Sequence, residues 1–146
     1  MQRAGLVDRV SVHCQSIYAD DLRAATGGGA PYDAAYFSGS LTLMPDPPAA
    51  LRAAAALLRE GGLIYVTQTF QNKPAPLMAV LKPLLRWVTT VDFGRLTLYA
   101  QAAQIVADAG MEIIEDAPVP GSIDTSAQTA RLLVLRPGGV AQKKRS

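Results

Sequence analysis

The stretch LLREGGLIYVTQTF, from Leu57 to Phe70, constrains the fold more than any other part of the chain. It places the end of a helix, two glycines and an apolar strand directly one after another. Glycine accepts the left-handed conformation that ends many helices, so we expect the helix to stop at Gly61 and Gly62. The run Leu63–Val66 is continuously apolar, as in strands buried on both faces of a sheet. This order predicts a helix that leads directly into a central strand.

The residues before this stretch supply the first strand and the helix of a βαβ unit. Ala34–Phe37 is a short apolar strand that ends in the small residues Ser-Gly-Ser. Asp46 can cap the helix that follows, and Pro47 suits its first turn. The helix is expected to run to Glu60, with one apolar face formed by Leu51, Ala54, Ala55 and Leu58. A strand, a helix and a strand in this order predict an α/β fold with a three-layer arrangement and a mostly parallel sheet.

The N-terminal residues predict one more strand and a short helix. Val10, Val12 and Cys14 alternate with polar residues, and this period of two indicates a strand within Val7–Gln15. We therefore expect Cys14 to be a small buried residue. A short helix is expected over Asp20–Ala25, and the glycine- and proline-rich loop that follows ends it.

The C-terminal half is expected to form two helices and then two strands. The helices are Pro76–Val88 and Leu98–Ala109, and Thr97 caps the second one. The strands are Met111–Asp116 and Arg131–Arg136. Because a loop and no helix joins these strands, we expect them to pair antiparallel at an edge of the sheet.

Composition and charge exclude several classes of protein. The chain has 146 residues, one cysteine, one histidine and a net charge of +2, much of it in the tail at Lys143–Arg145. The body is close to neutral, which argues against nucleic acid as a partner. No CxxC pattern is present, so no metal site is expected. The sequence has neither an apolar run of ~20 residues nor an apolar signal core, so we expect a cytoplasmic protein without a membrane contact.

The ordered series PDPPAAL, LLREGGLIYV, ADAGMEIIE and RLLVLRP resembles class I S-adenosylmethionine-dependent methyltransferases. The resemblance covers residues 1–137 as a partial domain, most clearly from residue 7 onward, and leaves 138–146 as a disordered basic tail. It implies a Rossmann-like three-layer sandwich whose mostly parallel sheet has an antiparallel C-terminal strand. It also implies S-adenosyl-L-methionine as cofactor and a small-molecule methyl acceptor.

The chain departs from the family pattern at its beginning. No glycine-rich turn follows its first apolar strand, and the cluster Gly27–Gly29 lies in a loop. Val7–Gln15 matches the third strand of the family, so the chain corresponds to strands three to seven and begins roughly 50 to 70 residues late. In the family, strands one and two lie between strands three and four, which leaves Ala34–Phe37 with an open edge. Three explanations stay open: the two flanking strands pair directly, another chain supplies the missing part, or the sequence is truncated.

The resemblance assigns site residues by position. Ser16 occupies a position that is often acidic and reaches the adenine amino group, and Ile17 could pack on the adenine ring. Beside the methionine end of the cofactor the resemblance places Phe37, Ser38, Gly39 and Ser40. Gln68 and Thr69 end the fifth strand, where the acceptor often binds. Asp92 and Arg95 could orient a small acceptor. No residue is identified as a catalytic base, because methyl transfer needs mostly positioning.

Three functions are compatible with these features. The first is a methyltransferase for a small molecule, incompetent alone if strands one and two are needed. The second is a non-catalytic remnant or subunit, in a homo-oligomer or with a completing chain. The third is another Rossmann-like enzyme, such as a nucleotide-dependent oxidoreductase, which the absence of a GxGxxG turn after a strand disfavours.

Overall fold

A parallel βαβ unit forms the centre of the fold in the computed structural model, which describes residues 10–29, 31–71, 97–122, 124–126 and 128–138. Strand β1 (Tyr32–Ser38) leads through helix α2 (Pro47–Leu57) to strand β2 (Leu58–Gln71). Strands β1 and β2 pair in parallel. The βαβ unit predicted from the Gly-Gly stretch is therefore confirmed.

The sheet is completed by three later strands, β3 (Thr97–Leu98), β4 (Met111–Pro118) and β5 (Gln128–Pro137). The order is β1-β2-β5-β4, with the short β3 paired to the end of β2. Strand β5 is antiparallel to both β2 and β4. The antiparallel C-terminal strand that the resemblance implies is therefore confirmed.

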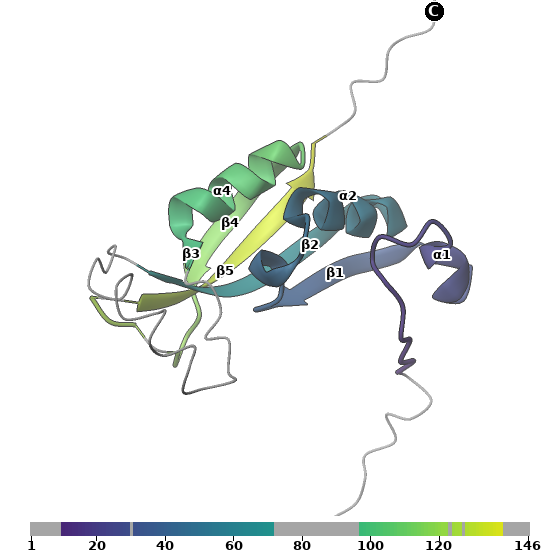
Figure 1. Ribbon diagram of the computed structural model, residues 1–146. Coiled ribbons are helices and arrows are strands. Elements are labelled where there is room, and N and C mark those ends of the chain that lie inside the picture. Colours follow the sequence, from purple (N-terminus) through teal and green to yellow (C-terminus); the bar gives the residue numbers. More distant parts are fainter. Residues whose placement is uncertain (1–9, 30, 72–96, 123, 127, 139–146) are drawn as a thin grey trace, which may run out of the picture.

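Helices α2 and α4 (Tyr99–Asp108) pack on one face of this mixed sheet (Figure 1). Helix α2 contacts helix α4, while α2 also lies against β2 and α4 against β4. The core is formed between these two layers, and its fully buried larger side chains are Leu51, Ile64, Val66, Phe70, Val106, Leu133 and Leu135. The helix expected at Pro76–Val88 lies outside the described residues. No described helix is long and apolar enough to cross a membrane.

Helix α2 begins as predicted but ends earlier. The Asp46 carboxylate accepts a hydrogen bond of 3.0 Å from the Ala49 amide, as a cap should. The predicted end at Glu60 is wrong, because Leu58 already pairs with Tyr32 on β1. The glycines shape the irregular strand entry that follows: Gly61 has a φ of +74°, and a Cβ on Gly62 would lie 2.9 Å from the Leu58 Cβ.

Two further predictions concern helices, and one of them is confirmed. The helix predicted to begin at Leu98 begins at Tyr99 as α4, because Thr97 and Leu98 pair with the end of β2 as β3. The short helix near Asp20 is confirmed as α1 (Leu22–Ala25).

The strand predicted within Val7–Gln15 is wrong over its described residues. Residues 10–15 form no strand, Val12 is 91% exposed, and Cys14 is exposed rather than buried. A strand needs a hydrogen-bonded neighbour, and within the described residues β1 pairs only with β2. Direct pairing of the two flanking strands is therefore excluded for this segment. The chain just beyond is held instead on α2, where Arg23 donates to the Ala56 carbonyl at 2.8 Å.

Candidate functional site

The ends of β1 and β2 are staggered, and the stagger opens a hollow at the carboxyl end of the sheet. The Gly39 amide donates to the Thr67 carbonyl at 2.8 Å, which closes the ladder between the two strands. Strand β2 continues to Gln71, and β3 begins to pair only at Phe70. A hollow of about 520 Å³ lies here; we call it the strand-end hollow, and it is lined by Tyr36, Ser38, Gly39, Thr67, Gln68, Thr69, Val119 and Ala130.

The strand-end hollow brings together residues that the sequence placed in two different roles. Ser38 and Gly39 were expected beside the cofactor, and Gln68 and Thr69 beside the acceptor. All four line the one hollow. Adjacent parallel strands end at the same edge of a sheet, which is where doubly wound proteins bind their ligands.

Position 39 needs glycine because of its backbone conformation, and not because neighbouring atoms leave no room for a side chain. Its φ is +63°, a conformation that side chains rarely adopt, and a Cβ there would meet nothing within 4 Å. The turn after β1 therefore needs glycine, and the space above it stays open to the strand-end hollow.

Tyr36 is a lining residue that the sequence did not reveal. Its hydroxyl is hydrogen-bonded to the Thr67 hydroxyl at 2.7 Å. Hydrogen bonds from Thr67, and then from Ser38, lower the pKa of Tyr36 below its usual value. Pairing Tyr36 with Thr67 requires the register of β1 on β2, so no motif could have indicated it.

The side chain of Gln68 lies on the helix-facing side of β2, with Val66 and Phe70, and not on the side of Tyr36 and Thr67. Its Oε1 atom is buried and has no hydrogen bond within the described residues. Arg131 lies opposite Gln68 in the β2–β5 ladder. The Arg131 guanidinium is bound to the Asp116 carboxylate at 2.6 Å and lies 6.0 Å from the centre of the Tyr99 ring.

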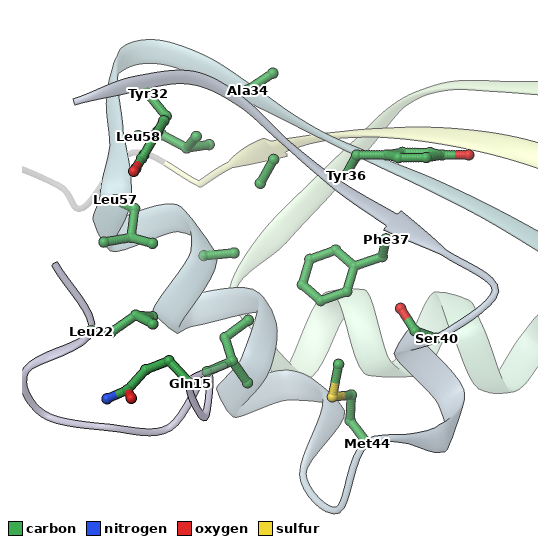
Figure 2. Close-up of a pocket in the computed structure, with 13 residues that line it drawn as sticks. Gln15, Leu22, Tyr32, Ala34, Tyr36, Phe37, Ser40, Met44, Leu57 and Leu58 are labelled. Atoms are coloured by element: carbon green, nitrogen blue, oxygen red, sulfur yellow. The ribbon is translucent and has the colours of Figure 1, made fainter. Parts of the chain in front are cut away.

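A second hollow, the edge hollow, lies between the N-terminal segment, β1 and α2 (Figure 2). Its volume is about 340 Å³. Figure 2 shows Phe37 pointing from β1 toward Met44 and Ser40, while Tyr36 points the opposite way. The predicted cofactor residues that line the edge hollow are Ile17, Phe37 and Ser40. Phe37 is only 5% exposed and also anchors the core.

Of the remaining predicted site residues, one lines neither hollow and two cannot be placed. Ser16 is exposed, and its hydroxyl accepts a hydrogen bond of 3.2 Å from the Tyr18 amide. Asp92 and Arg95 lie outside the described residues. Tyr36 lines both hollows.

The lining chemistry is neutral. No carboxylate, lysine or arginine lines either hollow within the described residues. Hydroxyls, a carboxamide and apolar side chains suit a ligand that presents hydrogen-bonding groups beside an apolar body. The strand-end hollow therefore offers hydroxyl groups and apolar surface, but no charged side chain among the described residues.

Comparison with known proteins gives a consistent class. No family model matches the chain. The chain is 29% identical over 110 residues to a ubiquinone biosynthesis O-methyltransferase of Cupriavidus pinatubonensis (strain JMP 134 / LMG 1197). The match covers 73% of this chain and 43% of that protein, so the chain spans less than half the length of this curated relative.

Solved structures show the fold. The mitomycin 7-O-methyltransferase MmcR matches with a TM-score of 0.60 at 16% identity, over 92% of this chain and 36% of that one. The O-methyltransferase NcsB1, in complex with S-adenosylmethionine and a hydroxynaphthoic acid, has a TM-score of 0.55 at 19% identity, over 91% and 35%. The cyclase SpnF has a TM-score of 0.61 at 19% identity, over 92% and 58%.

The described residues have the class I methyltransferase fold, in agreement with the sheet order. The solved relatives cover this chain almost completely while extending well beyond it. Because a cyclase shares the fold, the fold alone does not determine the reaction.

Proposed function

We propose that this chain is part of a methyltransferase that transfers a methyl group from S-adenosyl-L-methionine to a small molecule in the cytoplasm. The observation that carries the proposal is the convergence of Ser38 and Gly39 with Gln68 and Thr69 in the strand-end hollow. When bound, the cofactor supplies a methyl group on a sulfonium, and transfer to an in-line acceptor depends mainly on positioning.

In this proposal the edge hollow binds the adenine side of the cofactor, and the strand-end hollow binds the methionine end and the acceptor. Ile17, Phe37 and Ser40 form the edge hollow, which is apolar enough for the adenine side of the cofactor. Ser38 and Gly39 hold the methionine end, and Gln68 and Thr69 contact the acceptor. Ser16 contributes a hydroxyl near the adenine, and Asp92 and Arg95 orient the acceptor from the segment between the helices.

The free edge of β1 is where the rest of the domain joins the sheet. Residues 1–137 then form one part of the domain, and a parallel strand from a completing polypeptide pairs with β1. That polypeptide is either another part of a longer protein or a separate chain. The open edge also favours the second candidate function, a non-catalytic subunit that keeps the fold and binds a partner.

Calorimetric titration with S-adenosylhomocysteine tests the proposal with a matched pair of variants. Gly39→Leu places a bulky side chain at the strand-end hollow, while Gly121→Leu makes the same change at a second open glycine with a φ of +73° outside both hollows. We expect the wild type and Gly121→Leu to bind and Gly39→Leu to lose about tenfold or more in affinity.

Equal binding by the two variants would contradict the placement of the cofactor. Absence of binding by a folded wild-type chain would favour the subunit. The β1 edge would then be tested by searching for binding of a completing polypeptide.

A further inference from the structure

Three hydroxyl groups lie together on the face of the sheet that is turned away from α2 and α4. Tyr36 and Ser38 are two residues apart on β1, so their side chains point to the same side of the strand. Phe37, between them, points to the other side and is buried in the core. Ser38 is paired in register with Thr67 on β2, and the three hydroxyl-bearing residues all line the strand-end hollow.

The phenolic oxygen of Tyr36 is the atom at which these hydroxyls meet. It lies 2.7 Å from the Thr67 hydroxyl oxygen, and the hydrogen bond between them uses only one of their two O–H groups. Hydrogen bonds donated by Thr67 and Ser38 lower the pKa of Tyr36. When both residues donate, the protonated Tyr36 keeps its own O–H for a further partner. Tyr36 is 61% exposed, so a molecule in the strand-end hollow can reach it.

The lining around Tyr36 indicates which kind of group it would bind. Val119 and Ala130 provide apolar surface, and no lysine or arginine lines the strand-end hollow within the described residues. A negatively charged oxygen would be bound there by hydroxyl donors, and such charge-assisted hydrogen bonds are stronger than neutral ones. Hydrogen bonds in a chain strengthen one another, so donation by Thr67 makes Tyr36 a better donor. These features fit the ionised hydroxyl oxygen of a small molecule with an apolar body.

We infer that the Tyr36 hydroxyl donates a hydrogen bond to the methyl-accepting oxygen of the small molecule and stabilises that oxygen in its ionised form, while Thr67 and Ser38 position the Tyr36 oxygen; the inference rests on the proposed function. The acceptor hydroxyl loses its proton to the solvent, which leaves an electron pair on the oxygen for a bond to the methyl carbon. Fixed hydrogen-bond donors around an oxyanion stabilise charge that would otherwise depend on water.

The probe that tests this inference is para-nitrophenol, because its ionised form absorbs at a longer wavelength than its neutral form. At a fixed pH where part of the probe is ionised, binding through Tyr36 should increase the long-wavelength absorbance as wild-type chain is added. The methyl ether para-nitroanisole keeps the ring and cannot ionise. We expect it to bind about tenfold more weakly or not at all.

Three variants assign the effect to the Tyr36 hydroxyl. Tyr36→Phe keeps the ring without the O–H, and it should lose about tenfold or more in affinity for the ionised probe. Thr67→Val removes the same internal hydrogen bond but keeps the Tyr36 O–H, so its loss should be only about twofold. Tyr65→Phe makes the matched change on the same face of β2 at a residue that lines neither hollow, and it should bind as the wild type does. Circular dichroism of each variant establishes that it is folded.

Several outcomes would overturn the inference. These are an unchanged probe spectrum with the folded wild-type chain, equal binding of the two probes, equal binding by Tyr36→Phe and the wild type, or a loss in Thr67→Val or Tyr65→Phe as large as that in Tyr36→Phe. Titration with S-adenosylhomocysteine on the same samples separates the two proposals. Cofactor binding without the increase in absorbance would leave the proposed function intact, whereas the increase without cofactor binding would leave only a site for ionised hydroxyl compounds.

Discussion

Two tyrosines near the site have pKa values that move in opposite directions from 10.0. Hydrogen bonds from Thr67 and Ser38 lower the pKa of Tyr36. Burial raises the pKa of Tyr99, and a hydrogen bond to Asp116 and its negative charge raise it further. The pKa of Tyr36 thus depends on hydrogen bonds at the strand ends, whereas the pKa of Tyr99 depends on burial and on Asp116.

Alkaline titration followed by phenolate absorbance should separate the two tyrosines. Tyr36→Phe should remove a component that ionises below pH 10, and Tyr99→Phe one that ionises above it. The contribution of Tyr99 to stability is full below its unfolded pKa and lost as pH rises through the raised folded value. That of Tyr36 appears as pH rises through its lowered value and is complete above the unfolded one. Identical titration curves for the two variants would contradict these environments.

At the residue scale, part of the site could be predicted from the sequence. Ser38 and Gly39 end one apolar strand and Gln68 and Thr69 end the next, so their meeting follows from the parallel βαβ unit. The Tyr36–Thr67 contact and the unpaired Gln68 oxygen could not be predicted, because they depend on the register of the strands and on which acceptor Arg131 binds.

Helix α2 determines where the two strands of the site lie. Asp46 starts it with a side-chain cap to the Ala49 amide, and its buried face is formed by Ala50, Leu51 and Ala54. The Tyr18 hydroxyl also bonds the Asp46 amide and carbonyl at 3.2 and 3.1 Å. The N-terminal segment is thereby attached to the same end of the helix.

Replacement of the cap measures its contribution. Asp46→Ala should lower the free energy of unfolding by about 1 kcal/mol, as measured by denaturant titration, because the Ala49 amide loses its acceptor. Asp46→Asn keeps an acceptor and is the matched control. An equal loss in both variants would mean that the negative charge, and not the cap, stabilises the helix.

Elements were predicted well where local signals and the tertiary fold agree. Pro47, the glycines and the apolar run at Leu63–Val66 gave the βαβ unit correctly. The alternation around Val12 failed because a period of two describes a strand only when a neighbouring strand pairs with it. The end of α2 was misplaced because pairing of Leu58 with Tyr32 overrides the helical pattern.

In the sheet of the described residues, the central strand β2 is paired on both sides, whereas β1 is paired on one side. Strand β2 lies between β1 and β5 and contributes Ile64, Val66 and Phe70 to the core. Strand β1 is at the edge of the described sheet, and Tyr36 on it is 61% exposed. This asymmetry is the structural basis for proposing that another polypeptide joins at β1.

Hydrogen exchange should reproduce this asymmetry. We expect the amides of β2 and β5 to be the most protected, and half of the β1 amides to exchange quickly because they point away from β2. Mass spectrometry of the chain alone would measure both. Protection of β1 equal to that of β2 would mean that the edge is already covered, and the proposal of a joining strand at β1 would be wrong.

The central claim is that the strand-end hollow holds the cofactor beside Gly39 and Gln68. The most direct measurement is a crystal structure of the chain with S-adenosyl-selenohomocysteine, in which the anomalous signal of selenium locates the reacting centre of the cofactor. We predict a selenium peak in the strand-end hollow, between the Gly39 turn and Gln68. A peak elsewhere, or none at saturating ligand, would contradict the account.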